Sequence, residues 1–312
     1  KQVYKILNYL IRDYMKGDTK GDIMDISKII DEIYNELVEI RRDFHKNPEL
    51  SQNELRTQGK IREYLNQWGI ENYVSAETGL VGIIRGKNPG KTIGIRGDID
   101  ALPIDEKNKV PYSSVNQGVM HACGHDAHAT VVLGVGKIIK ELADSKESIN
   151  GNVKLFFQPA EETIGGGDRM VKEGCMENPT VDYVLGLHVM SYLDAGKVEL
   201  KYGKLNASTD SINITLKGKA SHGAYPDKGV DAIVMAGNVI TALQTIVSRN
   251  TSPLNSVVIS LGKISGGVKD NVIADEVKIS GTLRSLDNET RQYTKERISS
   301  IVSSVAMAYG GE

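Results

Sequence analysis

Cysteine is scarce in this sequence, and neither sign of charge is in excess. Two cysteines among 312 residues cannot form a disulfide framework, which favours a reducing, cytoplasmic environment. The 38 basic residues nearly balance the 40 acidic ones, so composition gives no basis for binding nucleic acid or a membrane surface. We therefore expect a cytoplasmic protein that acts on a small molecule or a peptide.

Long apolar runs and targeting patterns are also lacking. No uninterrupted apolar run reaches the roughly 18 residues expected of a membrane span, and no secretory pattern is present. Residues 1–23 precede Met24 and are predicted to be an N-terminal extension outside the main fold. The length favours two further domains, at roughly 150 residues each.

The first two thirds of the chain alternate between helical and strand-like patterns. Helices are predicted at 26–44, 53–68 and 123–143, from apolar residues at helical spacing. Strands are predicted at 79–86, 92–98, 152–159 and 182–189, the first two as neighbours and the last two as central strands covered on both faces. This alternation predicts a layered α/β domain over residues 24–200.

The pattern changes after about residue 200. Strands at 209–219, 255–264 and 275–286 and helices at 229–248 and 288–308 give the order β-α-β-β-α. This order is one strand short of the β-α-β-β-α-β unit. We therefore expect a separate α+β domain over residues 201–312.

Polar residues follow three of the predicted strands of the first domain. Three of the six histidines lie in "MHACGHDAHAT", residues 120–130, where the long helix begins. In open α/β sheets ligands bind at the carboxyl ends of the strands, so these side chains are predicted to converge at one edge. The residues that follow the strands are Asp98, Asp100, Glu161, Glu162 and His188.

The types of these residues suit a metal centre. Thiolate, imidazole and carboxylate together fit zinc or a neighbouring first-row ion. Taken singly, His188, the Glu161–Glu162 pair and Cys123 are each more often structural; their convergence is what favours a site. Cys175 and His45 are interpreted as structural.

Six blocks of this sequence resemble one family. They are "RGDIDALPI", "MHACGHDAHAT", "FQPAEE", "GLHV", "SHGAYPDKGVDAI" and "GTLRS", in this order, and the likeness covers about residues 24–312. The chain is similar to the bacterial amidohydrolases of the aminoacylase–carboxypeptidase metallopeptidase family, which includes hippurate hydrolases, N-acyl-amino-acid amidohydrolases and auxin-conjugate hydrolases. The resemblance implies a zinc-exopeptidase-like α/β domain, with a mixed sheet and helices on both faces, and an inserted α+β lid or dimerisation domain.

The resemblance also implies roles for individual residues. Cys123 resembles a thiolate that bridges two metal ions, and His125, Glu162 and His188 resemble further ligands. Glu161 resembles the general base, and Asp100 the acid that orients a ligand. Asp98 stands where relatives with a His-x-Asp motif carry a metal histidine. In the second domain His222 resembles a lid histidine that reaches across a dimer, and Asn271 and Arg284 resemble residues that hold a substrate carboxylate.

The implied function is hydrolysis of the amide bond of N-acyl amino acids or small peptides. It would use two divalent ions per subunit (zinc, or manganese, cobalt or nickel), a metal-activated water and a homodimer formed through the lid. The family carries another ligating histidine after the lid, and none follows His222 here. The C-terminal part of the catalytic domain and the end of the lid domain are therefore expected to be absent from this sequence. The alternatives are an inactive or truncated metal-binding homologue that acts through lid-mediated dimerisation, and a two-metal phosphoesterase.

Overall fold

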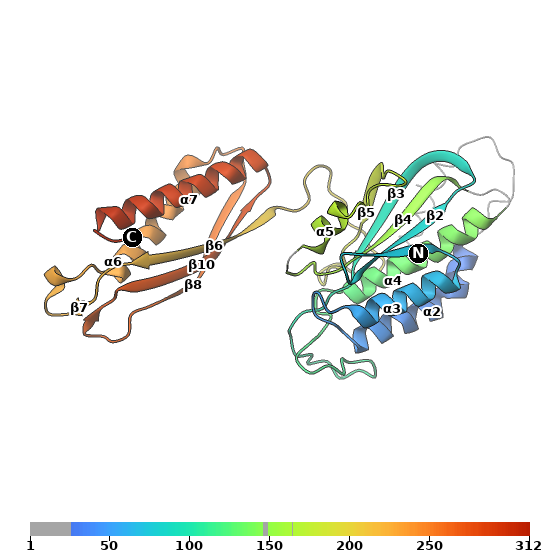
Figure 1. The fold of residues 1–312 in the computed structure, drawn as a ribbon, viewed down its shortest axis with the longest axis horizontal. Helices are drawn as coiled ribbons and strands as arrows, with labels where there is room; N and C mark the ends of the chain where they lie inside the picture. Colours follow the sequence, from blue (N-terminus) through green and yellow to red (C-terminus); the bar gives the residue numbers. More distant parts are fainter. Residues whose placement is uncertain (1–25, 146–148, 164) are drawn as a thin grey trace. The chain divides into compact units, whose positions relative to one another are not determined.

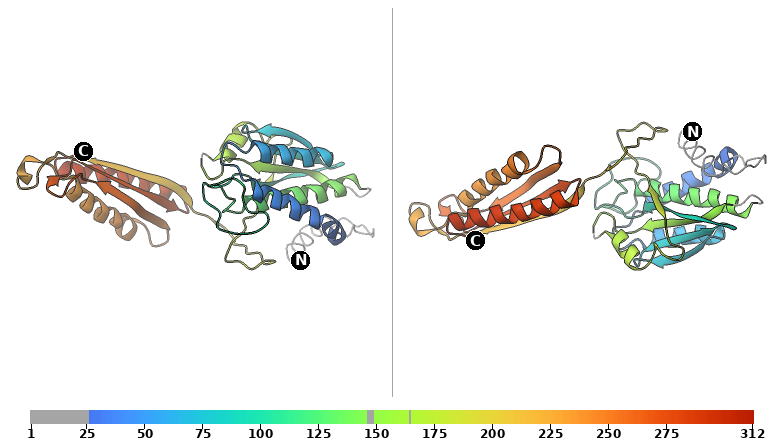
Figure 2. Two further views of the ribbon diagram at one scale, coloured as in Figure 1. Left: turned by 90° about the horizontal axis from the view of Figure 1, so that it is seen from below. Right: turned by 90° about the horizontal axis from the view of Figure 1, so that it is seen from above.

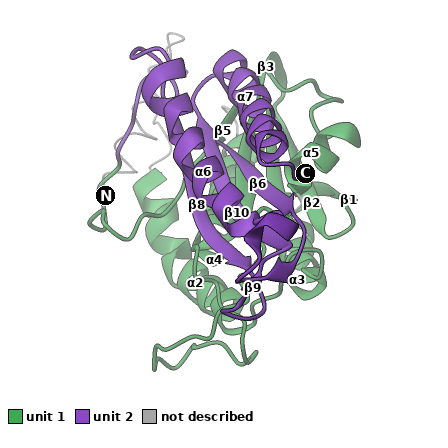
Figure 3. Cartoon of the chain, turned by 90° about the vertical axis from the view of Figure 1, so that its left-hand side faces the viewer, with its two compact units in different colours: residues 1–198 green, residues 199–312 purple. Residues whose placement is uncertain are grey.

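The computed structural model describes residues 26–145, 149–163 and 165–312. The chain divides between Val198 and Glu199 into two compact units, coloured separately in Figure 3. Each unit has its own hydrophobic core and is described by itself. The predicted extension over residues 1–23 lies outside the described residues.

The first unit is built on a five-stranded mixed sheet (Figure 1). The strand order is β1-β2-β4-β3-β5. Strands β3, β4 and β5 run parallel, whereas β2 is antiparallel to β4 and β1 is antiparallel to β2. The predicted mixed sheet is thus confirmed. Its strands are β1 (Glu71–Ser75), β2 (Gly79–Arg85), β3 (Asn88–Asp98), β4 (Asn150–Gln158) and β5 (Tyr183–Gly186).

The prediction that the strands at 79–86 and 92–98 are neighbours is wrong, because β4 lies between them. The chain passes from β2 to β3 across the start of β4. A Cβ on Gly86 or Gly90 would lie 2.5 or 2.6 Å from the backbone of Gly151, so glycine is needed for this close approach. The apolar runs alone do not reveal such an insertion.

The prediction that the strand near 182–189 is central and covered is also wrong. Strand β5 spans only Tyr183–Gly186 and pairs with β3 alone, so it is an edge strand of the described sheet. Tyr183, Val184 and Leu185 are 61%, 48% and 51% exposed. An apolar run indicates side chains suited to burial, and it does not say whether a strand has one neighbour or two.

Helices cover both faces of this sheet, as predicted. Helices α2 (Ile26–Lys46), α3 (Leu55–Gln67) and α4 (His125–Asp144) cover one face, with Phe44, Ile61 and Leu133 packed against Leu155 and Phe157. The short α5 (Gly166–Lys172) and the segment after it cover the other, where Met170 and Cys175 contact residues of β2 and β4. Cys175 is buried in this second core.

The second unit is a three-stranded antiparallel sheet covered on one face by two helices. Strands β6 (Ser208–Lys217), β10 (Glu276–Ser285) and β8 (Val257–Gly266) lie in that order, and α6 (Ala232–Thr245) and α7 (Asn288–Ala308) lie side by side (Figure 2). Burial alternates along β6, as its sequence predicts. A small ladder, β7 (Ser221–His222) with β9 (Val272–Ile273), was not predicted.

Helix α6 continues through a wider turn, Ile246–Asn250, to give an apolar helix over Ala232–Asn250. By length and composition this helix could cross a membrane, although its sequence holds no uninterrupted apolar run of that length. Met235, Val239 and Leu243 on it are fully buried and pack in the core against the sheet. This is the arrangement of a core helix.

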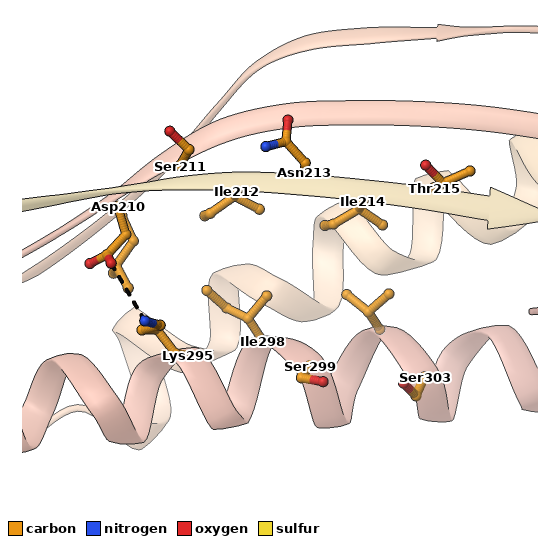
Figure 4. A pocket seen from close by; sticks show the side chains of 12 residues that line it. Asp210, Ser211, Ile212, Asn213, Ile214, Thr215, Lys295, Ile298, Ser299 and Ser303 are labelled. Atoms are coloured by element: carbon orange, nitrogen blue, oxygen red, sulfur yellow. Dashed lines mark ion pairs between the residues drawn. The ribbon is translucent and has the colours of Figure 1, made fainter. Parts of the chain in front are cut away.

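A groove runs between the edge strand β6 and α7 (Figure 4). Ile212 and Ile214 of β6 and Ile298 and Val302 of α7 line it. At one end Asp210 accepts two hydrogen bonds from Arg291, both 2.6 Å long, and forms an ion pair with Lys295 at 3.6 Å. The hydrogen bond from Arg291 is the main cause that lowers the pKa of Asp210 below its usual 3.8.

This ion pair should stabilise the protein in a pH-dependent way. Because the pKa of Asp210 is lowered in the folded state, its contribution is present at neutral pH and is lost as the pH falls through the lowered value. Arg291→Met should lower the free energy of unfolding modestly at pH 7, since the guanidinium is partly exposed. Urea unfolding of both proteins from pH 7 to pH 3 checks this. A difference that stays constant over that range would contradict it.

Candidate metal centre

The site lies at the edge of the first sheet where β3, β4 and β5 end. Asp98 is the last residue of β3, Glu161 and Glu162 follow β4, and His188 follows β5 by two residues. Because the three strands are parallel, their carboxyl ends meet at this edge. The start of α4 brings His125 to the same place.

The predicted ligand atoms lie close together. The Sγ of Cys123 is 3.4 Å from Nε2 of His188, and Nε2 of His125 is 3.8 Å from Oε1 of Glu162. His125 belongs to all three close groups of donor atoms, each within 4.8 Å: one with Cys123 and His188, one with Glu161 and Glu162, and one with Asp98 and His128. The other three predicted ligands and the predicted base thus surround His125.

A glycine between the first two ligands permits this approach. Gly124 precedes α4 with φ = 85°, in the left-handed region. A Cβ at this position would lie 2.3 Å from Cγ2 of Val189, the residue after His188. Glycine therefore turns the chain from Cys123 to His125 and leaves room for the segment that carries His188.

Asp100 holds three parts of the site together. One carboxylate oxygen pairs with Nδ1 of His125 at 3.1 Å, and the other accepts hydrogen bonds from Ser51 Oγ at 2.7 Å and Glu162 N at 3.0 Å. A hydrogen bond at Nδ1 fixes the tautomer in which Nε2 carries the free lone pair. This geometry suits the predicted role of Asp100 in orienting a ligand.

The residues present fit a divalent cation. Nε2 of His125 is fully buried and makes no hydrogen bond among the described residues. Burial raises the pKa of the Cys123 thiol to about 12, and the neighbouring Glu162, Asp98 and Glu161 carboxylates add to the rise. A bound cation would supply the positive charge that favours the thiolate and would provide a partner for the free imidazole nitrogen.

Glu161 lies beside His125 and Glu162, and the pKa of its carboxyl group is shifted. Burial, reinforced by the charge of Glu162, raises its pKa above the usual 4.5. The residue before it, Ala160, has φ = 49° and donates its backbone N–H to the buried Glu54 at 2.8 Å. Glu54 thus stabilises the left-handed backbone of Ala160, directly before Glu161.

Asp98 is engaged by protein groups on both carboxylate oxygens. Oδ1 pairs with Nδ1 of His128 at 2.6 Å, and Oδ2 pairs with Nη1 of Arg96 at 2.7 Å. Nε2 of His128 in turn accepts the backbone N–H of Val189 at 2.9 Å, while His188 donates Nδ1–H to the Val189 carbonyl at 2.6 Å. Asp98 therefore contacts the segment of His188 through His128, and its Oδ2 also lies 3.6 Å from Nε2 of His125. The partners on both oxygens favour a role in positioning His188.

Two buried histidines near the centre differ in their contacts. Burial lowers the pKa of His121 to about 4, and neither ring nitrogen has a hydrogen-bond partner among the described residues. The contact of His128 with the centre was not predicted from the sequence. Its position three residues after His125, on the same face of a helix, was the available signal.

Three residues of the second unit were predicted to belong to the site, and the structure places two of them together and the third apart. His222 and Asn271 are neighbours, because Gly223 N donates to the Asn271 carbonyl at 2.8 Å and His222 pairs with Val272. Arg284 pairs with Thr209 and Val258 at the opposite end of the sheet. The nine residues of β10 from Glu276 to Arg284 span about 25 Å, and Figure 1 shows β7 at the far end of this unit.

The donors at the sheet edge and the separate α+β unit are the parts that a two-unit metallohydrolase would need. Over residues 94–304 the sequence matches the model of peptidase family M20/M25/M40. The chain belongs to this family, and its named relatives include amidohydrolases that act on acylated amino acids. The resemblance seen in the sequence is thereby confirmed.

Individual relatives support the same conclusion. The chain is 42% identical to the N-acetyl-L-cysteine deacetylase of Bacillus subtilis over 88% of its own length and 65% of that protein. It is also 42% identical to the hippurate hydrolase of Campylobacter jejuni, over 91% of the chain and 73% of that protein. A solved structure of a dinuclear metal-binding M20 peptidase from B. subtilis superposes with a TM-score of 0.75 at 33% identity, covering 90% of this chain and 72% of that one. The chain thus spans about two thirds to three quarters of these proteins.

Two variants distinguish whether Asp98 positions His188 through His128 or binds the metal directly. Asp98→Asn and His128→Leu should each weaken metal binding about 10-fold or more, because each releases the segment that holds His188. Their effects should not add in the double variant, since both break the same connection. Chelator competition with the purified variants measures the affinities. Normal metal affinity in His128→Leu, with a large loss in Asp98→Asn, would instead make Asp98 a direct ligand.

Proposed function

We propose that this protein is a metal-dependent amidohydrolase that cleaves the amide bond of N-acyl amino acids or small peptides. The observation that carries the proposal is the gathering of Cys123, Glu162, His188 and the free Nε2 of His125 beside Glu161. The named relatives support this reaction, and they do not favour an inactive homologue or a phosphoesterase.

The chain offers a defined set of groups to hold the ions. Cys123, His125, Glu162 and His188 would be the ligands, and Sγ of Cys123 lies 3.4 Å from Nε2 of His188. Two divalent ions, when bound, would polarise the scissile carbonyl and lower the pKa of water from about 16 towards 7. Thiolate and imidazole suit zinc, and manganese, cobalt or nickel are alternatives set by availability.

Glu161 is the group placed to move the proton. Its raised pKa brings it closer to neutrality, where a carboxylate is a more effective base. It would take a proton from the attacking water and pass it to the amide nitrogen as the carbon–nitrogen bond breaks. The products are then a carboxylic acid and a free amine.

Arg284 and Asn271 would select a substrate that carries a carboxylate. A guanidinium presents a planar pair of N–H donors that matches a carboxylate. This recognition fits the two relatives above, whose names describe the removal of acyl groups from amino acids. It also disfavours neutral amides as substrates.

The second unit supports a homodimer in which two copies share a site. In one copy, His222 and Asn271 lie at one end of the sheet and Arg284 lies at the other, about 25 Å away along β10. This distance exceeds the span of an N-acyl amino acid. A site that uses both groups must therefore take them from different copies. His222 would reach across the dimer and stabilise the negative charge on the carbonyl oxygen.

Glu161→Gln should keep the metal and remove turnover. The amide has nearly the same shape but cannot accept the proton, so kcat should fall about 100-fold or more. Metal content per chain and hydrolysis of hippurate by the full protein measure the two properties. A variant with nearly normal kcat would rule out Glu161 as the base.

Mixing two inactive variants tests the shared site. His222→Ala and Glu161→Gln proteins should each be inactive, but a mixed dimer would contain one site with both native groups. After subunit exchange the mixture should recover about a quarter of the native rate. No recovery, with exchange verified by mass spectrometry, would place His222 and Glu161 of one copy in the same site.

A further inference from the structure

His45 forms a buried connection that the proposed reaction does not use. It lies in the last turn of α2, and its side chain is 6% exposed. Nδ1 is 2.7 Å from Oδ2 of Asp126, and Nε2 is 3.1 Å from Oε1 of Glu106. The side chains of Asp126 and Glu106 are 0% and 4% exposed. One imidazole thus joins two buried carboxylates.

The charges of this group are matched. Hydrogen bonding to Asp126 is the largest cause that raises the pKa of His45, with a further contribution from Glu106. The protonated ring has two N–H donors, one for each carboxylate. Arg41 adds a second positive charge, because its Nε lies 3.0 Å from the same Asp126 oxygen.

The two carboxylates belong to the segments on either side of Cys123. Asp126 follows His125 in the first turn of α4. Glu106 lies in the loop 103–119, which Leu102 and Met120 close with two backbone hydrogen bonds of 3.0 Å. Glu106 also accepts the backbone N–H of Ser114 at 2.6 Å, so it fixes the interior of that loop.

Other bonds from the end of α2 reach the same loop. Val115 N donates to the Lys46 carbonyl at 2.9 Å, and Asn116 Nδ2 donates to the Pro48 carbonyl at 2.8 Å. These two contacts hold the loop against α2, but neither joins α2 to the start of α4. Through side chains, His45 and Arg41 provide that attachment.

We propose that His45 is a positioning residue of the metal centre, holding Glu106 and Asp126 so that Cys123 and His125 between them keep the spacing that metal binding needs. The inference rests on the proposed function only for the identity of the ligands. Substitution of His45 should therefore change the metal affinity and the geometry of the Cys123 thiolate, and not only the stability of the protein.

Three substitutions separate the two arms of this connection. The amide nitrogen of asparagine occupies nearly the position of Nδ1, and that of glutamine nearly the position of Nε2. His45→Asn therefore keeps the bond to Asp126, His45→Gln keeps the bond to Glu106, and His45→Phe keeps neither. Lys154→Met is the control, because Lys154 is also fully buried in this unit and donates to the carbonyls of Cys175 and Glu177, away from the centre.

The affinity of the metal-free proteins for zinc is measured by chelator competition, and urea unfolding gives their stability. His45→Phe should bind zinc about 10- to 100-fold more weakly than the native protein, with the asparagine and glutamine variants between them. With cobalt, the thiolate charge-transfer band should shift or weaken in the same order. Lys154→Met should lose stability and keep its zinc affinity and its cobalt spectrum.

The outcomes distinguish this inference from the proposed function. Native zinc affinity and an unchanged cobalt band in the asparagine and glutamine variants would overturn the role of His45, even if His45→Phe failed to fold. An equal loss of affinity in Lys154→Met would overturn it too, because the effect would then follow stability alone. Failure of the native protein to bind zinc or cobalt would reject the metal centre itself.

Discussion

Asp100 accepts hydrogen bonds from three separate segments, and the arrangement of the site depends on them. His125 comes from the start of α4, Ser51 from the turn before α3, and the backbone of Glu162 from the end of β4. The side chain is 0% exposed, so these bonds replace those that water would have made. They direct Nε2 of His125 towards the carboxylates and set the segment that presents Glu161.

A second constraint is the concentration of negative charge at one sheet edge. Asp98, Asp100, Glu161 and Glu162 lie around His125. After burial, the charges of Glu162 and Asp98 add to the rise in the pKa values of Cys123 and Glu161, and the charge of Glu161 adds to the rise at Cys123. Like charges at such distances disfavour one another unless a cation lies between them. Arg96 balances the charge of Asp98, while Asp98, Glu161 and Glu162 all border the free nitrogen of His125. The carboxylates at this site therefore need a bound cation to balance their charge.

The sequence predicts those parts of the site that depend on strand direction and on where each strand or helix ends. Parallel strands end at a common edge, so Asp98, Glu161 and His188 could be expected to meet, and the start of α4 could be expected beside them. The order of β2, β4 and β3 could not be predicted, because a crossing at three glycines leaves no periodic signal. The contacts of His45 with Asp126 and of His128 with Asp98 span 81 and 30 positions, and only the folded packing brings them together.

The most direct test of the central claim is to locate the metal by anomalous diffraction from crystals of the protein loaded with zinc. The account predicts anomalous density about 2.0–2.3 Å from Sγ of Cys123 and from imidazole nitrogens of His125 and His188, with Glu162 as a carboxylate ligand. Density coordinated by Asp98 and His128 in their place, or zinc found only at surface residues, would contradict it.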